Sequence, residues 1–376
     1  MVIHAKVSPS SSEMWLKCPP SATKPDPNMD EPSIYAEQGT EAHACCEYRL
    51  KTALGMEITD PRPNMKYYDE EMENCAEDYT NLVLEKIEEA KCACSDPVVL
   101  IEQKLYLQDY IPDGYGYGDC VIIADGTLQV IDYKHGLGVL VSSERNTQMM
   151  CFALGALKLV DCIYDISNVA MTIVQPRRAN ISTYEMTVDE LLTWGEEVLK
   201  PIAKLAYDGE GEYVAGEHCR FCKAKATCRA RADYNMELAK FDFTPAPELE
   251  SDEIAEILEK ADELISWAGD VKADALSEAL KRTNYPGFKI VEGRSVRKYT
   301  DEQMVAEAVA AAGIDPYEKK LLGITAMTSK LGRKRFDEIL GSLVYKAPGK
   351  PALVSVSDKR PAMNTAADDF KENEYE

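Results

Sequence analysis

The chain has 376 residues, of which 45% are hydrophobic, and its formal net charge at pH 7 is −23. This length allows two domains or one large domain with an appendage, the absence of a long apolar run excludes a membrane-spanning helix, and the acidic balance predicts weak nonspecific binding to nucleic acid. Twelve cysteines without a secretory apolar segment argue against a disulfide framework and favour metal ligands or buried thiols in a reducing cytoplasm.

The predicted elements of the first 210 residues alternate between helices and strands. A Ser- and Pro-rich segment precedes a helix that we expect to begin at Thr40, which can cap it. Further helices are expected at residues 68–93, 144–160 and 188–207. Strands are expected at residues 98–107, 115–124, 127–134, 169–177 and 181–188. This order predicts an α/β core in which a short mixed sheet is flanked by helices.

The remainder of the chain differs in composition. Residues 241–250 have the composition of a linker. Helical patterns follow at residues 251–283, 301–312 and 328–340, and a strand-like stretch lies at 287–299. We therefore expect a core over residues 1–240, a linker over 241–250, a mainly helical C-terminal domain over 251–340, and an extended or disordered tail over 341–376.

The two strands on either side of residues 125–126 form a predicted hairpin. The dipeptide Asp-Gly at that point is the strongest two-residue hairpin signal and predicts a primed turn. Counting outward from the turn sets Asp119 opposite Asp132, about 5 Å apart at Cβ, with Lys134 on the face of Asp132. Two facing carboxylates favour a Mg²⁺ or Mn²⁺ ion between them. The alternative is a hairpin whose polar ends simply reach solvent.

Five other residues bear on this hairpin. His43 lies in a predicted helix, with Glu47 one turn on to orient its ring, and would complete a mixed nitrogen and oxygen site. A lone histidine, however, is more often a residue without a ligand role. Gln148 lies on one helix face with Phe152, which is also what an ordinary amphipathic helix would show. Glu102 lies in the strand before the hairpin and is either a second acid near the site or a strand-end charge; we favour the strand-end charge.

A cysteine group follows the predicted core. Cys219, Cys222 and Cys228 have the spacing C-x2-C-x5-C, which predicts a metal or cluster site that needs a fourth ligand. Cys18 and His218 are the candidates for that ligand. The spacing does not separate zinc from an iron–sulfur cluster, and three free thiols are the simpler alternative.

In this order, the motifs resemble the PD-(D/E)XK nucleases of the RecB type, especially the AddB nuclease domain and the CRISPR-associated RecB-like exonucleases. The motifs are GTEAH (His43), GYGD (Asp119), IDYK (Asp132 and Lys134), NTQMMCF (Gln148) and the cysteine set. The resemblance covers about residues 10–232 and implies a restriction-endonuclease-like core. The C-terminal part resembles a prophage-associated family of unknown function that contains this nuclease core.

The resemblance also implies roles for individual residues. Mg²⁺ or Mn²⁺ would be bound by His43, Asp119, Asp132 and the carbonyl of Tyr133. Lys134 would activate the attacking water, and Gln148 would place Lys134 or the scissile phosphate. A [4Fe-4S] cluster, or alternatively Zn²⁺, would be held by Cys18, Cys219, Cys222 and Cys228. Phe152 stands where the family usually has tyrosine, and its ring could still stack on a base.

We therefore expect a Mg²⁺- or Mn²⁺-dependent deoxyribonuclease in the cytoplasm of a bacterial host. The resemblance favours an exonuclease that needs a single-stranded end and acts in phage or prophage DNA recombination or replication. The expected partners are DNA, single-stranded or with single-stranded ends, and a phage recombination or single-strand-binding protein, with no membrane. The alternatives are a catalytically inactive DNA-binding or replication and recombination scaffold on the same fold, and a zinc-clamped binding module.

Overall fold

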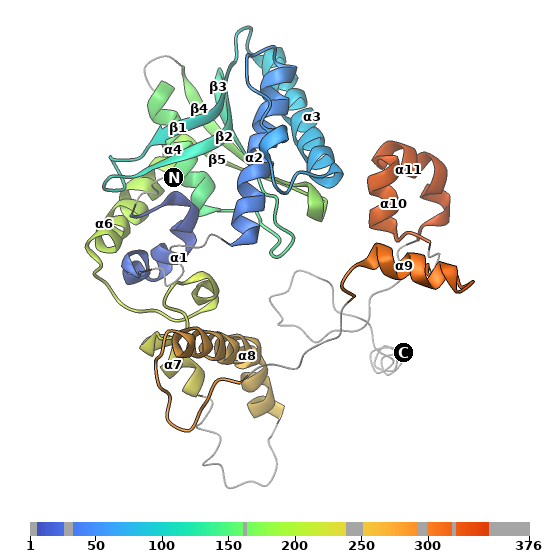
Figure 1. The fold of residues 1–376 in the computed structure, drawn as a ribbon. Coiled ribbons are helices and arrows are strands. Elements are labelled where there is room, and N and C mark those ends of the chain that lie inside the picture. Colours follow the sequence, from blue (N-terminus) through green and yellow to red (C-terminus); the bar gives the residue numbers. More distant parts are fainter. Residues whose placement is uncertain are drawn as a thin grey trace, which may run out of the picture.

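The computed structural model describes residues 6–25, 33–160, 164–237, 251–291, 299–317 and 321–345. Its centre is a five-stranded sheet in the order β1-β2-β3-β4-β5 (Figure 1). The strands are β1 (Val98–Tyr106), β2 (Tyr115–Ala124), β3 (Gly126–Tyr133), β4 (Ile166–Gln175) and β5 (Asn180–Thr187). β3 and β4 pair in parallel across a connection through α4, and the other neighbours pair antiparallel. The prediction of an α/β core with a mixed sheet is confirmed.

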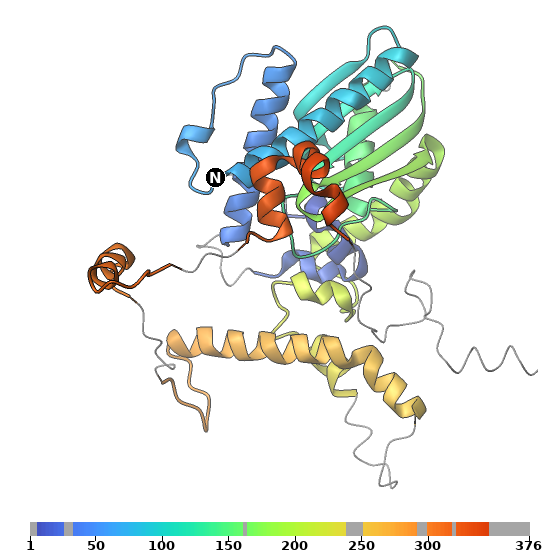
Figure 2. The ribbon, with the colours of Figure 1, turned by 90° about the vertical axis from the view of Figure 1, so that its right-hand side faces the viewer.

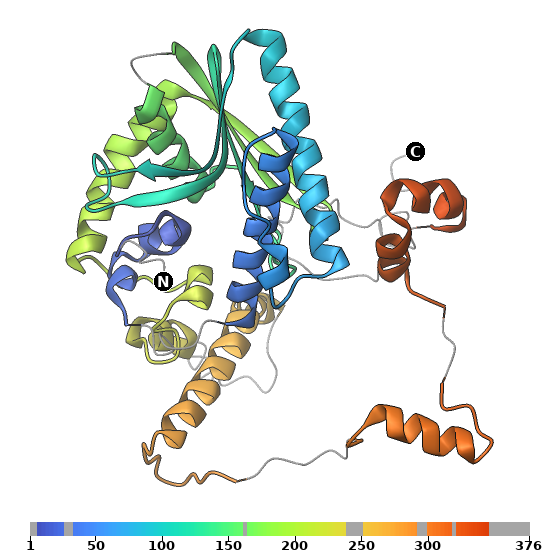
Figure 3. The same cartoon turned by 45° about the horizontal axis from the view of Figure 1, so that its top comes forward.

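Helices cover both faces of this sheet. Figure 3 shows α2 and α3 on one side of it, and α4 and α6 on the other. The helices of the core are α1 (Ser12–Lys17), α2 (Ile34–Ala53), α3 (Glu70–Ala93), α4 (Thr147–Val160), α5 (Val188–Trp194), α6 (Lys200–Asp208) and α7 (Arg229–Met236). A π-helical turn, Gly195–Leu199, joins α5 to α6.

The two faces of the sheet have separate apolar cores because side chains alternate along a strand. In β2, Cys120 and Ile122 pack with α2 and α3, whereas Val121 and Ile123 pack with α4. A strand covered on both faces reads as a continuous apolar run, and this explains the composition of β2.

The helix α2 begins earlier than predicted. Its N-cap is Ser33, whose side chain accepts a hydrogen bond from the backbone N–H of Ala36 at 3.2 Å. Thr40 lies inside the helix and donates its hydroxyl hydrogen bond to the carbonyl of Ala36 at 3.0 Å. The prediction was wrong because Ser33 and Thr40 are both acceptable caps, and Gly39 does not stop the helix, since one glycine inside a helix costs only about 1 kcal/mol.

The hairpin of β2 and β3 has the predicted register, with Ala124 opposite Thr127 and Cys120 opposite Ile131. The turn itself differs. Of its two residues only Gly126 has a positive φ, +80°, so the turn is not primed. The backbone N–H of Gly126 instead donates to the carbonyl of Asp165 at 3.0 Å, which ties the turn to the chain entering β4.

The C-terminal region is mainly helical, as predicted. It contains α8 (Ser251–Leu280), α9 (Glu302–Ala311), α10 (Ile324–Leu331) and α11 (Arg333–Leu340). The helix predicted over 328–340 is divided at Gly332, whose φ is +72°. Residues 287–291 form no strand, and 292–298 lie outside the described residues. The tail begins with a short 3-10 turn, Gly341–Leu343, and its residues 346–376 also lie outside.

The helix α8 is held to the core by charge. Figure 2 shows it as one long helix below the sheet, beside α7. Arg231 of α7 is fully buried and pairs with Glu263 at 2.5 Å and with Asp270 at 2.6 Å. None of the residues of α8 is fully buried, and these ion pairs join it to α7. The expected linker, 241–250, lies outside the described residues.

Among the described residues, no helix combines the length and the apolar composition that a bilayer crossing requires.

Candidate metal centre and cysteine pocket

Three side chains from three elements meet beside the sheet. His43 of α2, Glu102 of β1 and Asp119 of β2 each offer a ligand atom, and these atoms lie within 4.8 Å of one another. His43 Nδ1 lies 3.1 Å from Asp119 Oδ1. The three residues line a pocket with about 190 Å³ of empty space, part of it open to solvent. One imidazole and two carboxylates form a donor set that suits Mn²⁺ or Mg²⁺.

Glu102 reaches this group through an irregular strand. Its φ is +50°, a left-handed conformation that costs about 1–3 kcal/mol for a residue other than glycine. The pairing of β1 with β2 is interrupted between Ile101 and Gln103. Ile101 packs with α2 and α3, yet Leu105, four residues on, packs with α4, so the alternation is reset between them. The reset turns Glu102 toward α2 and His43.

The interpretation of Glu102 as a strand-end charge was therefore wrong. The residue lies in the middle of β1, opposite the position of Asp119. The signal in the sequence was an acid inside an otherwise apolar strand. Its register to Asp119 depends on the connection at residues 107–114, whose length does not specify how two strands align.

Asp119 is fixed by the backbone of the next strand. The ladder between β2 and β3 ends at Cys120 and Ile131, and Asp119 Oδ2 accepts a hydrogen bond of 2.7 Å from the backbone N–H of Tyr133. The ring of Tyr133 meets the His43 ring edge-on, with centroids 5.5 Å apart. Tyr133 thus contacts both residues, and the binding of a metal ion by its carbonyl stays a prediction.

Asp132, Lys134 and Gln148 form a second group next to the first. Lys134 Nζ lies 2.9 Å from Asp132 Oδ2 and donates to Gln148 Oε1 at 3.0 Å. The amide of Gln148 lies 3.5 Å from Asp132 Oδ1. The structure therefore brings together the lysine, the acid and the glutamine that the sequence singled out. Asp132 itself lies outside the group of three mutually close ligand atoms.

Asp132 retains acceptor capacity. Its side chain is almost completely buried. Its Oδ2 forms an ion pair with Lys134, but no donor reaches this oxygen with the geometry of a hydrogen bond. A buried carboxylate oxygen without a donor is costly. The binding of a cation by Asp132 together with Asp119 stays a prediction, because the mutually close ligand atoms are those of His43, Glu102 and Asp119.

The pKa values of His43, Glu102 and Asp132 are all raised at this site. Burial lowers the pKa of His43, but the carboxylates of Asp119, Asp132 and Glu102 outweigh it and raise that pKa to about 9. Burial, followed by the charge of Asp119, raises the pKa of Glu102 to about 8. Burial also raises the pKa of Asp132, against the opposing charge of Lys134. Without a cation, such a site holds protons that a metal ion must displace.

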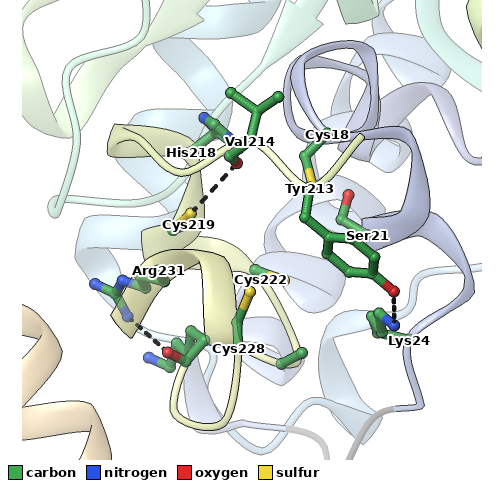
Figure 4. A pocket seen from close by; sticks show the side chains of 12 residues that line it. Cys18, Ser21, Lys24, Tyr213, Val214, His218, Cys219, Cys222, Cys228 and Arg231 are labelled. Carbon is green, nitrogen blue, oxygen red and sulfur yellow. Dashed lines mark hydrogen bonds between the residues drawn. The ribbon is translucent and has the colours of Figure 1, made fainter. Parts of the chain in front are cut away.

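The predicted cysteines face one pocket (Figure 4). Its empty space is about 350 Å³, including space open to solvent, and Cys18, Cys219, Cys222 and Cys228 all line it as free thiols. Cys18 follows α1, Cys219 lies in the 3-10 turn Glu217–Phe221, and Cys228 precedes α7. His218, the other candidate for a fourth ligand, lines the same pocket, and its Nε2 lies 3.0 Å from the carbonyl of Val214.

Two expectations about supporting residues were wrong. Phe152 of α4 is 4% exposed and its ring lies in the apolar core between this helix and the sheet, so it cannot stack on a base. Glu47 pairs with Lys51 at 2.6 Å, so Asp119 rather than Glu47 orients the ring of His43. In both cases the residues do share a helix face, as their spacing predicted. The spacing does not show which residues of other elements pack against that face.

Residues 4–361 match the model of one protein family, which is described as "Protein of unknown function (DUF2800)". The chain belongs to this family. Among solved structures, it is similar to a chain titled "Crystal structure of SSO0001", at 14% sequence identity and a TM-score of 0.22, over 51% of this chain and 98% of that chain. A TM-score of that size carries no argument about fold or activity.

In this DUF2800 protein, the arrangement combines three functions in a small volume. The first group offers nitrogen and oxygen ligands to a divalent cation. Lys134 adds a fixed ammonium beside it, and Asp132 and Gln148 hold that ammonium in place. A cation site next to an oriented lysine is suited to an anionic substrate, because both charges can stabilise negative charge that develops during the reaction.

Proposed function

We propose that this DUF2800 protein is a metal-dependent DNA nuclease of the PD-(D/E)XK, RecB-like type. The observation that supports the proposal best is the convergence of His43, Glu102 and Asp119 beside the ion pair of Asp132 and Lys134. The first group suits a hard divalent cation, and the second supplies the acid, the lysine and the spacing of the D-x-K motif.

Each residue has a role in phosphodiester hydrolysis. His43, Glu102 and Asp119 would hold Mg²⁺ or Mn²⁺, and Asp132, whose Oδ2 pairs with Lys134, would be a further ligand as the resemblance implies. The ion, when bound, neutralises phosphate charge and lowers the pKa of water. Lys134 places its ammonium where the phosphate gains negative charge. Gln148 accepts a hydrogen bond from Lys134 and thereby limits the positions that the ammonium can take.

The cysteine pocket would hold a [4Fe-4S] cluster, with Zn²⁺ as the alternative. The four thiols approach one pocket from segments 201 residues apart in the chain, and no disulfide links them. Closing a loop of that length is entropically unfavourable, and metal–thiolate bonds offset this cost. The cluster would therefore have a structural role. A purified protein with broad absorbance near about 400 nm supports iron–sulfur, whereas a colourless protein with stoichiometric zinc supports the alternative.

The test of the nuclease proposal is degradation of DNA with Mn²⁺. Asp119→Asn and Lys134→Met should each abolish hydrolysis of linear DNA while thermal melting shows a folded protein. Lys86→Met is the matched control, because Lys86 pairs with Glu89 on the exposed surface of α3. Full activity in Asp119→Asn or Lys134→Met would remove the assignment.

We further propose an exonuclease that requires a single-stranded end and acts in phage or prophage DNA recombination or replication, in the cytoplasm of a bacterial host. The support is the resemblance of the motifs to RecB-type enzymes. End-labelled linear DNA should be degraded from its ends, and circular single- and double-stranded DNA should persist. A wild-type protein that binds Mn²⁺ and DNA but hydrolyses neither form would instead be a catalytically inactive scaffold.

A further inference from the structure

The stretch GYGYGD, residues 114–119, has a two-residue period that the proposed catalytic groups do not explain. A Cβ on Gly116 would lie 2.5 Å from Cε1 of Phe152, and a Cβ on Gly118 would lie 3.1 Å from Cδ1 of Leu105. These glycines therefore face the tightly packed side of the sheet, under α4. Because side chains alternate, Tyr115 and Tyr117 face the opposite side. Asp119 lies on that side too, beside His43, although its neighbour Cys120 also packs there, so the reset beside Glu102 extends into β2.

The partner strand continues the same pattern. Lys104 is paired with Tyr117, and Tyr106 with Tyr115. Leu105 and Leu107, between and beyond them, are buried with α4, so Lys104 and Tyr106 point to the other face. After the reset at Glu102, the hairpin of β1 and β2 thus has three consecutive rows on one face: Glu102 with Asp119, Lys104 with Tyr117, and Tyr106 with Tyr115.

Successive rows are two residues apart, which is about 7 Å along a strand. The first row belongs to the candidate metal centre. The second and third rows, Lys104, Tyr106, Tyr115 and Tyr117, are called here the tyrosine track. The track leads directly away from the proposed catalytic residues, so it is continuous with their surface.

The track is open and contains one cation. Tyr106 is 46% exposed and Tyr117 is 44% exposed, although both lie in the sheet of a well-packed core. Lys104 Nζ lies 4.4 Å from the ring centroid of Tyr115 and 5.3 Å from that of Tyr106. The rings of Tyr115 and Tyr117 meet edge to face, with centroids 6.3 Å apart. Exposed aromatic faces beside a cation are the features that bind successive unpaired bases and a phosphate.

We propose that the tyrosine track binds the unpaired bases of a single-stranded DNA end and leads that strand to the metal centre. The proposal rests on the proposed nuclease function and adds the residues that select a single strand. Bases in a duplex are stacked on each other and cannot offer their faces to tyrosine rings, whereas unpaired bases can. A chain with a net charge of −23 repels phosphates, so stacking rather than charge has to supply most of the affinity.

The first experiment measures binding of the full-length protein to a fluorescently labelled single-stranded oligonucleotide, without added Mn²⁺ or Mg²⁺. Tyr106→Ala and Tyr117→Ala should each weaken binding between about fivefold and about 100-fold. Tyr106→Phe and Tyr117→Phe retain the aromatic face and should bind within about twofold of wild type. Tyr35→Ala, at an exposed tyrosine in the first turn of α2, is the positional control and should have no effect.

Two further measurements separate stacking from other causes. Blunt duplex should bind equally to wild type and to all four tyrosine variants. Lys104→Ala should reduce the slope of log K against log salt by about 0.7, because it removes one phosphate contact. Thermal melting shows whether each variant is folded; a lower melting temperature with unchanged single-strand affinity would assign the tyrosines to strand pairing alone and overturn the proposal. The proposal would also be overturned if the wild-type protein bound no single-stranded oligonucleotide; a protein partner would then be the alternative ligand of this face.

The nuclease proposal and the tyrosine track can fail separately. If wild type does not hydrolyse DNA but its single-strand binding depends on Tyr106 and Tyr117, the nuclease function is wrong and the track stands. If hydrolysis depends on Asp119 while Tyr106→Ala and Tyr117→Ala degrade single-stranded ends with wild-type kcat/KM, the track is wrong and the nuclease function stands.

Discussion

Replacing Glu102 by glutamine should stabilise the metal-free protein and weaken its binding of Mn²⁺. The side chain keeps its shape and loses its charge, and the left-handed backbone at this residue is unchanged. Burial and the charge of Asp119 raise the pKa of Glu102 from 4.5 to about 8. A raised carboxyl pKa means that the folded state holds its proton more tightly, so stability is lost as pH rises from about 4.5 to about 8.

The size of the effect follows from this shift. Each pKa unit corresponds to about 1.4 kcal/mol, so ionised Glu102 costs the metal-free protein up to about 5 kcal/mol above about pH 8 and almost nothing below about pH 4.5. Glu102→Gln should recover a part of it that increases with pH.

The assay is urea unfolding of the metal-free protein at several pH values, repeated with Mn²⁺. Glu196→Gln is the control, because Glu196 pairs with Lys200 on the surface, and it should change the free energy of unfolding by less than about 1 kcal/mol. Saturating Mn²⁺ should stabilise wild type more than Glu102→Gln, since it binds the folded state of wild type more tightly. A metal-free variant that is less stable than wild type at about pH 8 would refute the reasoning.

Three other predictions follow from the same structure. Lys134→Met should reduce kcat by at least about 100-fold, and a wild-type kcat would contradict the role of the ammonium. The same variant removes the partner of buried Asp132, so the free energy of unfolding in urea titrations should fall by about 2–3 kcal/mol. Mn²⁺ affinity should rise between about pH 6 and about pH 9, because the cation displaces protons from His43 and Glu102; calorimetry in buffers of different ionisation enthalpy should detect proton release on binding, and a value of zero would exclude it. Cys222→Ala should lose the colour or the zinc of the purified protein and melt at lower temperature, whereas Cys151→Ala, at a buried thiol of α4, should keep the cofactor; equal cofactor content in both would place the cofactor elsewhere.

Most of the elements could be predicted because their signals are local. The alternation of apolar residues and the Asp-Gly turn located β2 and β3 and their register, since a hairpin with a two-residue turn permits a single alignment. The short spacing of Cys219, Cys222 and Cys228 predicted one site for the same reason. The start of α2 was missed because Ser33 and Thr40 are both acceptable caps, and their neighbours in the sequence do not show which one the helix uses.

The candidate site was predicted only in part. His43, Asp119, Lys134 and Gln148 were expected near each other, and the structure places them so. Glu102 was misread because a left-handed residue inside a strand breaks the period that sequence analysis assumes. Phe152 was misread because the sequence pattern of a helix face is the same whether that face packs in the apolar core, as here, or lines a substrate site.

The sequence by itself determined most of the secondary structure, the strand register around residues 125–126 and the chemical types available for catalysis, because those depend on residues close together in the chain. Only the tertiary structure decided which acid joins His43 and Asp119 and which face the tyrosines of β1 and β2 occupy. Those contacts join residues that are far apart in the chain, and they depend on how the helices pack on the sheet and on one reset in its alternation.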